Sequence, residues 1–263
     1  MFGQANWEAA ESELQRRTAL CNMEKSGISR EKIRYLFGGD LLGQIVATSF
    51  GVSELEIPLF GLYGACSTMG EALSLSAMTV GGALPTASWL WRPAILPPQK
   101  NSSVFLLNME TSVLRLPPGL SREAERQLLQ TSGSLWPLQV LQRENHRLWC
   151  QRFNEYGCLH GTGSCRLIVA NFKDFETDEK YYDRIITGDL GTVGREILIN
   201  LVKEKGYDIS QIHMDCGIEI FDPQKQGTHA GGSGCGCSAV VFSSYIIDNV
   251  RDGKWKRILF IPT

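Results

Sequence analysis

Residues 33–67 read IRYLFGGDLLGQIVATSFGVSELEIPLFGLYGACS, and this stretch decides the fold class. Ile33 to Phe37 predicts a short buried strand, and Leu41 to Phe50 predicts a helix after a Gly-Gly-Asp turn. Residues 58–63 predict a second strand, which runs through a small-residue loop into a further helix. Strands that alternate with helices favour parallel pairing, so the stretch predicts an α/β protein.

The segment before this stretch predicts a helix with a defined start and end. Apolar and small residues recur at spacings of three and four, which places them on one helical face. Asn6 is a typical N-cap, and Gly27 is a typical terminator. The residues on the predicted inner face are Trp7, Ala10, Leu14, Thr18 and Cys21.

The C-terminal part repeats the same pattern. Residues 185–187 predict a strand that leads into Gly188-Asp189-Leu190 and a helix ended by Gly206. Residues 217–221 predict the next strand, and the Gly-rich loop 231–238 follows. A helix through Val240 and Val250 and a last strand at 257–261 complete the repeat. Two similar halves are therefore expected, with a site between their loops.

The block 84–166 differs in composition from the rest of the chain. It has no Asp, one Lys, four of the six Trp and seven of the ten Pro, and its formal charge is +4 against −6 for the remainder. Strands favour β-branched residues and turns favour Asp, yet this block has 15 Leu, three Val and one Ile. Two interpretations remain: a long irregular insertion, or a segment that was never selected to fold.

The overall composition excludes several classes of protein. The 263 residues carry a net charge of −2, which gives no electrostatic footprint for nucleic acid or an anionic membrane. No apolar run reaches the roughly 18 residues that a membrane span needs, and the N-terminus shows no signal peptide. The eight Cys are expected to be mostly free thiols.

Cys66 lies where a strand meets a predicted helix. Helix N-termini stabilise thiolates, so this position suits a reactive Cys. The alternative is a small buried Cys at a site with no room for a larger residue.

The Gly-rich loop and the two repeated aspartates each allow two interpretations. Successive N–H groups around Gly232, Ser233 and Cys235 suit a carboxylate or phosphate, but a close helix–strand crossing explains the glycines equally well. Asp40 and Asp189 follow strand ends, where α/β proteins bind ligands. The interpretation that we favour for both is an N-cap of the next helix.

Metal and histidine chemistry are weakly supported. Cys235 and Cys237 are too close for the usual zinc-binding spacing, so no metal site and no cofactor are predicted. His229 is a candidate base for Cys66, but an exposed loop histidine is the favoured interpretation.

Both flanks resemble the stage V sporulation protein AD family of spore-forming bacteria. The resemblance rests on FGGDLLGQIVATSFGVSELEIPLFGLYGACSTMGEALSLSAMTVGG, on YYDRIITGDLGTVGREILINLVKEKGYDI and on AGGSGCGCSA. It covers residues 1–83 and about 167–263. It implies a thiolase-like fold of two pseudo-symmetric halves with mixed, largely parallel sheets, which agrees with the repeat.

The resemblance also implies a function. The family moves dipicolinic acid, a small aromatic dicarboxylate, into the forespore and binds it. Cys66 aligns with the thiolase nucleophile, but the family is not thought to run condensation chemistry, so the implied role is binding rather than catalysis. The implied ligand-binding residues are Asp40, Cys66, Ser67, Asp189, Gly232, Ser233 and Cys235.

The implied partners are other stage V sporulation membrane proteins and a second copy of the chain, with no nucleic acid. The implied location is cytoplasmic or peripheral at the forespore or spore inner membrane. The rival interpretations are an acyltransferase that uses Cys66 as nucleophile, and a non-functional truncated product.

Three departures from the family pattern matter. A strand segment expected before Asn6 and a Gly-Ala-Leu-Leu-Ser segment expected after Thr263 are absent, so both ends are expected to be incomplete.

The middle lacks the family sequence, yet residues 99–121 can be back-translated so that another frame reads EKQFRFPFEYGNQRPPTAPWTV. We therefore expect a frameshift near residue 84 that is restored near Arg166. The expected organisation is a partial half at 1–83, an irregular segment at 84–166 and a partial half at 167–263.

Overall fold

The structure is a computed structural model that describes residues 3–40, 45–81, 103–108, 128–130, 156–232, 234 and 236–262. The chain divides into two compact units, and each unit contains a sheet of its own. Unit 1 comprises residues 1–111 and 124–139, and unit 2 comprises residues 112–123 and 140–263.

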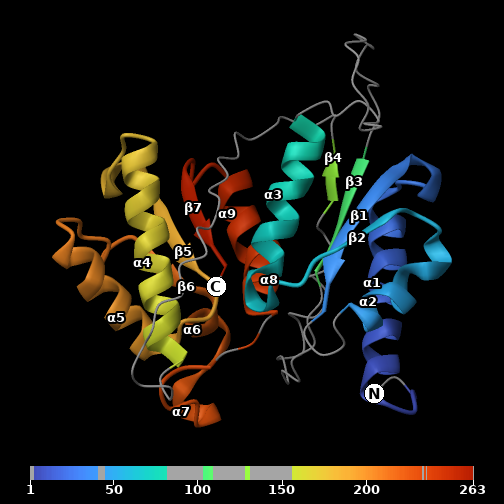
Figure 1. The fold of residues 1–263 in the computed structure, drawn as a ribbon, viewed down its shortest axis with the longest axis horizontal. Coiled ribbons are helices and arrows are strands. Elements are labelled where there is room, and N and C mark those ends of the chain that lie inside the picture. Colours follow the sequence, from blue (N-terminus) through green and yellow to red (C-terminus); the bar gives the residue numbers. More distant parts are fainter. Residues whose placement is uncertain are drawn as a thin grey trace. The chain divides into compact units, whose positions relative to one another are not determined.

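Unit 1 is a four-stranded sheet with helices on its two faces (Figure 1). The strand order is β2-β1-β3-β4; β1 pairs in parallel with β2 and β3, whereas β4 runs antiparallel to β3. Helices α1 and α2 lie on one face and α3 lies on the other (Figure 1). The elements are α1 (Trp7–Ser26), β1 (Ile33–Gly39), α2 (Val46–Val52), β2 (Leu59–Gly61), α3 (Thr68–Gly81), β3 (Ser103–Asn108) and β4 (Leu128–Gln130).

Helix α1 begins and ends at the residues that the sequence predicts. The Asn6 side chain accepts a hydrogen bond from the N–H of Ala9 at 2.8 Å, which satisfies one free donor of the first turn. Gly27 adopts the left-handed conformation at φ 65°, and its N–H donates to the carbonyl of Glu24. Ala19 is fully buried and packs in one apolar cluster with Leu36 of β1.

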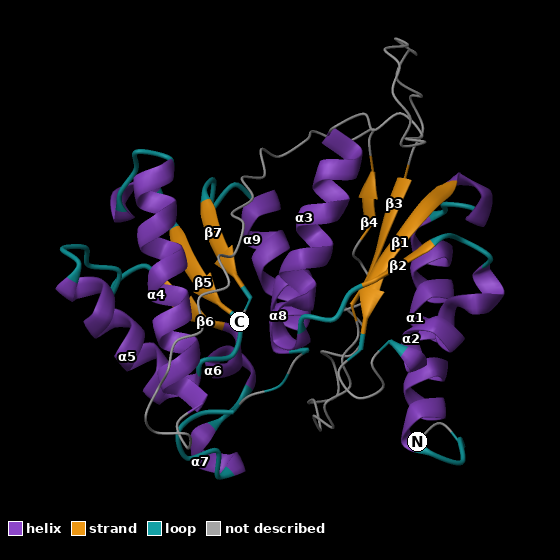
Figure 2. Cartoon of the chain, in the orientation of Figure 1, coloured by secondary structure: helices purple, strands orange, loops and turns teal. Residues whose placement is uncertain are grey.

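Unit 2 is a three-stranded parallel sheet in the order β6-β5-β7. Helices α4 and α5 lie on one face, and α8 and α9 lie on the other (Figures 1 and 2). A π-helical turn at Phe242–Ile246 joins α8 to α9. The elements are α4 (Tyr156–Asp174), β5 (Arg184–Thr187), α5 (Gly191–Glu204), β6 (His213–Asp215), α6 (Cys216–Ile220), α7 (Pro223–Gln226), α8 (Cys237–Val241), α9 (Ile247–Arg251) and β7 (Ile258–Ile261).

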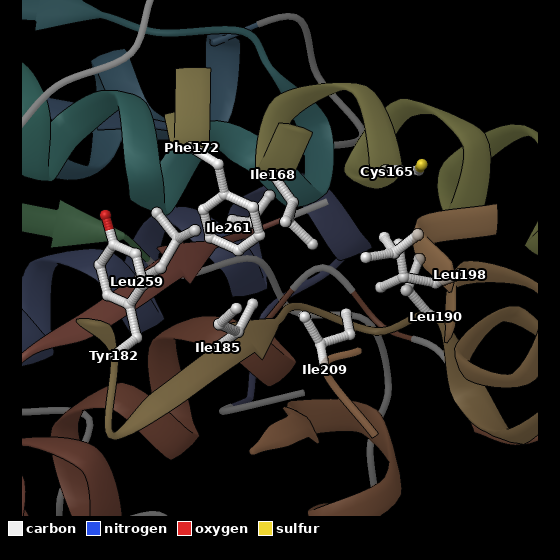
Figure 3. Packing of buried hydrophobic residues seen from close by; sticks show 11 residues of the cluster. Cys165, Ile168, Phe172, Tyr182, Ile185, Leu190, Leu198, Ile209, Leu259 and Ile261 are labelled. Atoms are coloured by element: carbon white, nitrogen blue, oxygen red, sulfur yellow. The ribbon is translucent and has the colours of Figure 1, made fainter. Parts of the chain in front are cut away.

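The core of unit 2 has a layer on each face of the sheet. Ile185 and Ile186 are neighbours on β5 and both are fully buried, but they belong to different apolar clusters, because successive strand residues point to opposite faces. Ile185 packs with Phe172 of α4 and Leu198 of α5 (Figure 3). Ile186 packs with Val241 on the other face.

The two units share one topology, as the repeat in the sequence predicts. In each unit a helix precedes the central strand, a helix leads to the parallel edge strand, and another helix leads to a parallel strand on the opposite side. Strand β1 thus corresponds to β5, β2 to β6, and β3 to β7. The α/β class and the largely parallel sheets are confirmed.

Two predicted elements differ in the structure. The helix predicted at 41–50 is α2 at Val46–Val52, and residues 41–44 lie outside the described part. The strand predicted at 217–221 is wrong: the strand is β6, four residues earlier, and Cys216–Ile220 is helix α6. The reason is Asp215, whose side chain accepts from the N–H of Ile218 and starts a helix there.

Regular elements occur within the compositionally unusual block 84–166. Strands β3 and β4 lie inside it, and α4 begins at Tyr156, ten residues before the expected restoration of the frame. The other residues of the block up to 155 lie outside the described part of the chain.

Candidate functional site

Cys66 lies immediately before α3, in a single 3₁₀ turn at Ala65–Ser67. The residue is buried, with 6% of its surface exposed. The loop around it is closed by its own hydrogen bonds: Ser67 donates through Oγ to the Gly64 carbonyl at 2.7 Å, and Thr68 Oγ1 accepts from the Gly64 N–H at 3.1 Å. The predicted position of Cys66 at the entry to a helix is therefore confirmed.

Asp40 satisfies free donors at the start of α2, as an N-cap would, although the N-cap position itself is occupied by Ile45. It is fully buried at the end of β1. Its Oδ2 accepts from the N–H of Thr48 at 2.9 Å and from Thr48 Oγ1 at 2.8 Å, and its Oδ1 accepts from the N–H of Ile45 at 3.0 Å. Both carboxylate oxygens of Asp40 thus bind protein donors at the start of α2.

Asp189, its counterpart in the repeat, has a different role, and the prediction that it caps the next helix is wrong. Asp189 is 3% exposed, and its Oδ2 accepts from the N–H of Gly234, 45 residues later in the chain, at 2.9 Å. Asp189 therefore fixes the Gly-rich loop, because its carboxylate anchors a backbone donor of that loop.

Asp215 supplies the cap that Asp189 does not. Its two oxygens accept from the N–H groups of Leu190, Gly191 and Ile218 and from the hydroxyl of Thr187, at 2.7 to 3.2 Å. Burial raises the pKa of Asp215, and these four hydrogen bonds oppose that rise. One carboxylate thus joins β5, the start of α5 and the start of α6.

The Gly-rich loop packs closely against its surroundings. A Cβ at Gly232 would lie 2.0 Å from the ring of Phe221, and a Cβ at Gly231 would lie 2.5 Å from the Cα of Gly191. The loop also uses its own donors: Gly231 donates to Thr228, Gly234 to Asp189, and Cys237 to Gly234. The glycines thus allow a close approach to Phe221 and to the start of α5 rather than a helix–strand crossing, and three N–H groups of the loop are already engaged.

His213 on β6 is buried, with 7% of its surface exposed. Burial, together with the charge of Arg195, lowers its pKa to about 3, so the ring is neutral. Thr187 donates its single proton to Asp215, so its oxygen accepts from His213 Nε2 at 3.1 Å. Nδ1 is therefore the unprotonated nitrogen, and it has no hydrogen-bond partner within the described ranges.

The other predicted residues fall into three groups. His229 is exposed with φ 48°, as its favoured interpretation predicts. Ser233 and Cys235 lie outside the described residues. Within the part of the chain that the structure describes, no three His, Cys, Asp or Glu side chains are grouped to hold a metal ion. In the same part, no helix is both long and apolar enough to cross a membrane.

Sequence reasoning missed two residues, Asp215 and Glu11. Asp215 carries a usable signal, because an Asp directly before Cys-Gly-Ile is a typical N-cap pattern. Glu11 carries no such signal. It lies on α1 with 3% of its surface exposed, and its position in the sequence pattern does not distinguish it from an exposed Glu on a helix.

The repeated topology and the matching loops define a duplicated α/β protein with a buried Cys at the entry to a helix. The chain belongs to the stage V sporulation protein AD family, whose model matches residues 1–88 and 152–263. The unmatched stretch 89–151 lies inside the block 84–166. The chain is 30% identical over 266 residues to stage V sporulation protein AD of Bacillus subtilis (strain 168), covering 99% of this chain and 77% of that protein.

Among solved structures, the chain resembles the tetronic acid condensing enzyme AbyA1. The TM-score is 0.44 with 9% sequence identity, over 79% of this chain and 69% of that one. A likeness this distant carries no functional information about this chain.

Proposed function

We propose that this chain acts in sporulation as a binding protein for dipicolinic acid during uptake of that ligand into the forespore. The observation that carries the proposal is membership of the stage V sporulation protein AD family, supported across both flanks of the chain. The proposed ligand-binding residues are those that the family resemblance implies: Asp40, Cys66, Ser67, Asp189, Gly232, Ser233 and Cys235.

The hydrogen bonding of the site favours binding over catalysis. Asp40 and Asp189 both accept hydrogen bonds from protein N–H groups, so each carboxylate has a structural use that competes with action as a general base. His229, the candidate base for Cys66, is exposed. Small residues on either side of Cys66 and in the Gly-rich loop allow the backbone to approach a planar ligand closely.

Calorimetry with dipicolinate tests the proposal. We expect Cys66→Ser to bind dipicolinate within about threefold of the unaltered protein, because binding does not need a nucleophile. Picolinate, which lacks one carboxylate, should bind at least tenfold more weakly than dipicolinate. The unaltered protein failing to bind dipicolinate would refute the proposal.

The rival acyltransferase has a distinct signature. Incubation with an acyl-CoA followed by intact-mass measurement would show a thioester that disappears in Cys66→Ser. Such an adduct, together with loss of dipicolinate binding in the Ser variant, would replace the binding role by acyl transfer.

We further propose that the chain reaches the forespore membrane through other stage V sporulation membrane proteins and that it forms a homodimer. Co-purification with those proteins from sporulating cells and sedimentation of the purified chain test the two statements separately.

A further inference from the structure

Unit 2 has a pocket at the open edge of its sheet, separate from the residues of the proposed dipicolinate site. Its volume is about 480 Å³, and it is lined by residues of β5, β6, α5 and the segment after α9. Strand β6 is an edge strand of the described sheet, and the lining includes Arg195 from α5 on one face and Trp255 from the cluster on the other face. The lining residues that matter here are Arg184, Arg195, His213, Glu219, Tyr245 and Trp255.

Two guanidinium groups give the pocket its capacity for an anion. Among the described residues, Arg195 on α5 donates only a long hydrogen bond of 3.5 Å to the Ser210 carbonyl, and Arg184 donates to the adjacent Asp183 carbonyl at 2.8 Å. A guanidinium has five N–H donors, so one carbonyl leaves most donors of each Arg for another acceptor. A ligand carboxylate is the acceptor that matches this geometry.

The same pocket carries acceptors for a hydrogen-bond donor. Glu219 is exposed and lies in the lining, so its carboxylate oxygens are open to a ligand; the His213 ring also lines the pocket, but its Nδ1 is buried. Asp215 also lines the pocket, but both of its oxygens are engaged by four protein donors. With two guanidinium groups and two carboxylates, the lining is electrically balanced.

An aromatic wall completes the pocket. The guanidinium of Arg184 lies over the Trp255 ring, 5.5 Å from its centroid, and Tyr245 meets the same ring edge-on at 5.6 Å. Trp255 is 9% exposed, whereas Tyr245 is 48% exposed. This wall suits an apolar side chain of a ligand.

We propose that this pocket binds a small zwitterion with an apolar side chain, the chemistry of a free amino acid such as phenylalanine or leucine. The carboxylate pairs with Arg195 and Arg184, the ammonium donates to Glu219, and the side chain packs on Trp255. A dianion such as dipicolinate does not fit, because its second carboxylate would face Glu219. This inference stands apart from the proposed dipicolinate function.

Calorimetry with L-phenylalanine and L-leucine tests the pocket. We expect binding of at least one of them, and at least tenfold weaker binding of 3-phenylpropionate and 2-phenylethylamine, which each lack one charge of phenylalanine. Binding of neither amino acid, or equal binding of the singly charged analogues, overturns the proposal.

Variants locate the site. Arg195→Met and Arg184→Met should each weaken amino-acid binding at least tenfold, whereas Arg166→Met, an exposed arginine on α4 outside the pocket, should leave it unchanged. Thermal unfolding of each variant confirms that the protein is folded. Unchanged binding in both pocket variants, or displacement of the amino acid by dipicolinate, would overturn the assignment.

Discussion

Glu11 and Asp215 are both buried carboxyl groups, but they differ in hydrogen bonding. Asp215 receives four hydrogen bonds, whereas neither oxygen of Glu11 has a hydrogen-bond partner in the described part of the chain. Burial, followed by the nearby charges of Asp40 and Glu8, raises the pKa of Glu11 to about 7. Glu11 therefore carries a proton at mildly acidic pH that an unfolded Glu has already lost.

The protonation of Glu11 predicts a stability that falls with rising pH. The folded chain holds more protons than the unfolded chain between pH 4.5 and about 7, so the free energy of unfolding decreases across that window and levels off above it. Glu11→Gln should remove this dependence and raise the free energy of unfolding at pH 8 by roughly 2 kcal/mol. Denaturant titrations at pH 5 and pH 8 measure the difference.

The exposed Glu24→Gln is the matched control on the same helix, because Glu24 is not among the groups that raise the pKa of Glu11, and its two titrations should differ as those of the unaltered protein do. An identical pH dependence in the Glu11 variant would show that Glu11 is not the group responsible.

Asp215 should be the more costly carboxylate to remove. Asp215→Ala leaves three N–H groups and the Thr187 hydroxyl without their acceptor, so we expect a loss of about 3 kcal/mol in the free energy of unfolding. Asp222, an N-cap of the short helix α7, is the control; Asp222→Ala should cost about 1 kcal/mol or less. Similar losses for both variants would mean that the Asp215 network contributes little.

At the scale of the element, the start of α1 depends on one side chain. Asn6→Ala removes the acceptor for the N–H of Ala9 and should lower the free energy of unfolding by about 1 kcal/mol. Asn6→Asp keeps an acceptor and adds a charge that the helix dipole favours, so it should retain the stability of the unaltered protein. Urea denaturation followed by circular dichroism distinguishes the two, and equal losses would contradict the capping role.

The Gly-rich loop is constrained by its neighbours rather than by flexibility. Gly232→Ala places a methyl group against the Phe221 ring, and we expect a loss of about 1–3 kcal/mol from the forced shift. Gly163→Ala on α4 is the control, because a Cβ there meets nothing within 4 Å and Ala favours helix; it should be neutral or stabilising.

Adding Phe221→Ala to Gly232→Ala tests the contact itself. The double variant should lose less stability than the sum of the two single changes, since the methyl group then has room. Strict additivity in thermal unfolding would show that the loss in Gly232→Ala comes from elsewhere.

At the scale of the whole molecule, the block 84–166 is where the sequence of this chain departs from that of its family. The family model matches on both sides and leaves 89–151 unmatched. The composition of the block and the concealed family sequence at 99–121 support a frameshift, which stays a prediction. A segment whose local sequence conflicts with the surrounding fold lowers stability and invites proteolysis.

Resequencing the source DNA across residues 84–166 and their flanks is the direct test of the frameshift. We expect a continuous frame that encodes the family segment after a single-base correction. If the DNA confirms the block as written and no other reading frame encodes the family segment, the block is a true insertion. Limited proteolysis of the purified chain should cut first within 84–166 if the block has no folding pattern, and initial cleavage within 1–83 or 167–263 would argue the opposite.

The sequence by itself determined the features that depend on neighbours along the chain. Asn6 and Gly27 bound α1 because caps act within three or four residues, and the alternation of strands and helices predicted two parallel sheets of one topology. The tertiary structure alone decided which aspartate caps α5. Gly234, the donor bound by Asp189, is 45 residues away, and Leu190 lies 25 residues from Asp215, so only folding brings either carboxylate to its donor. Asp215 then starts a helix at 216–220, where the pattern predicts a strand, because a carboxylate beside a free N–H outweighs weak local propensity.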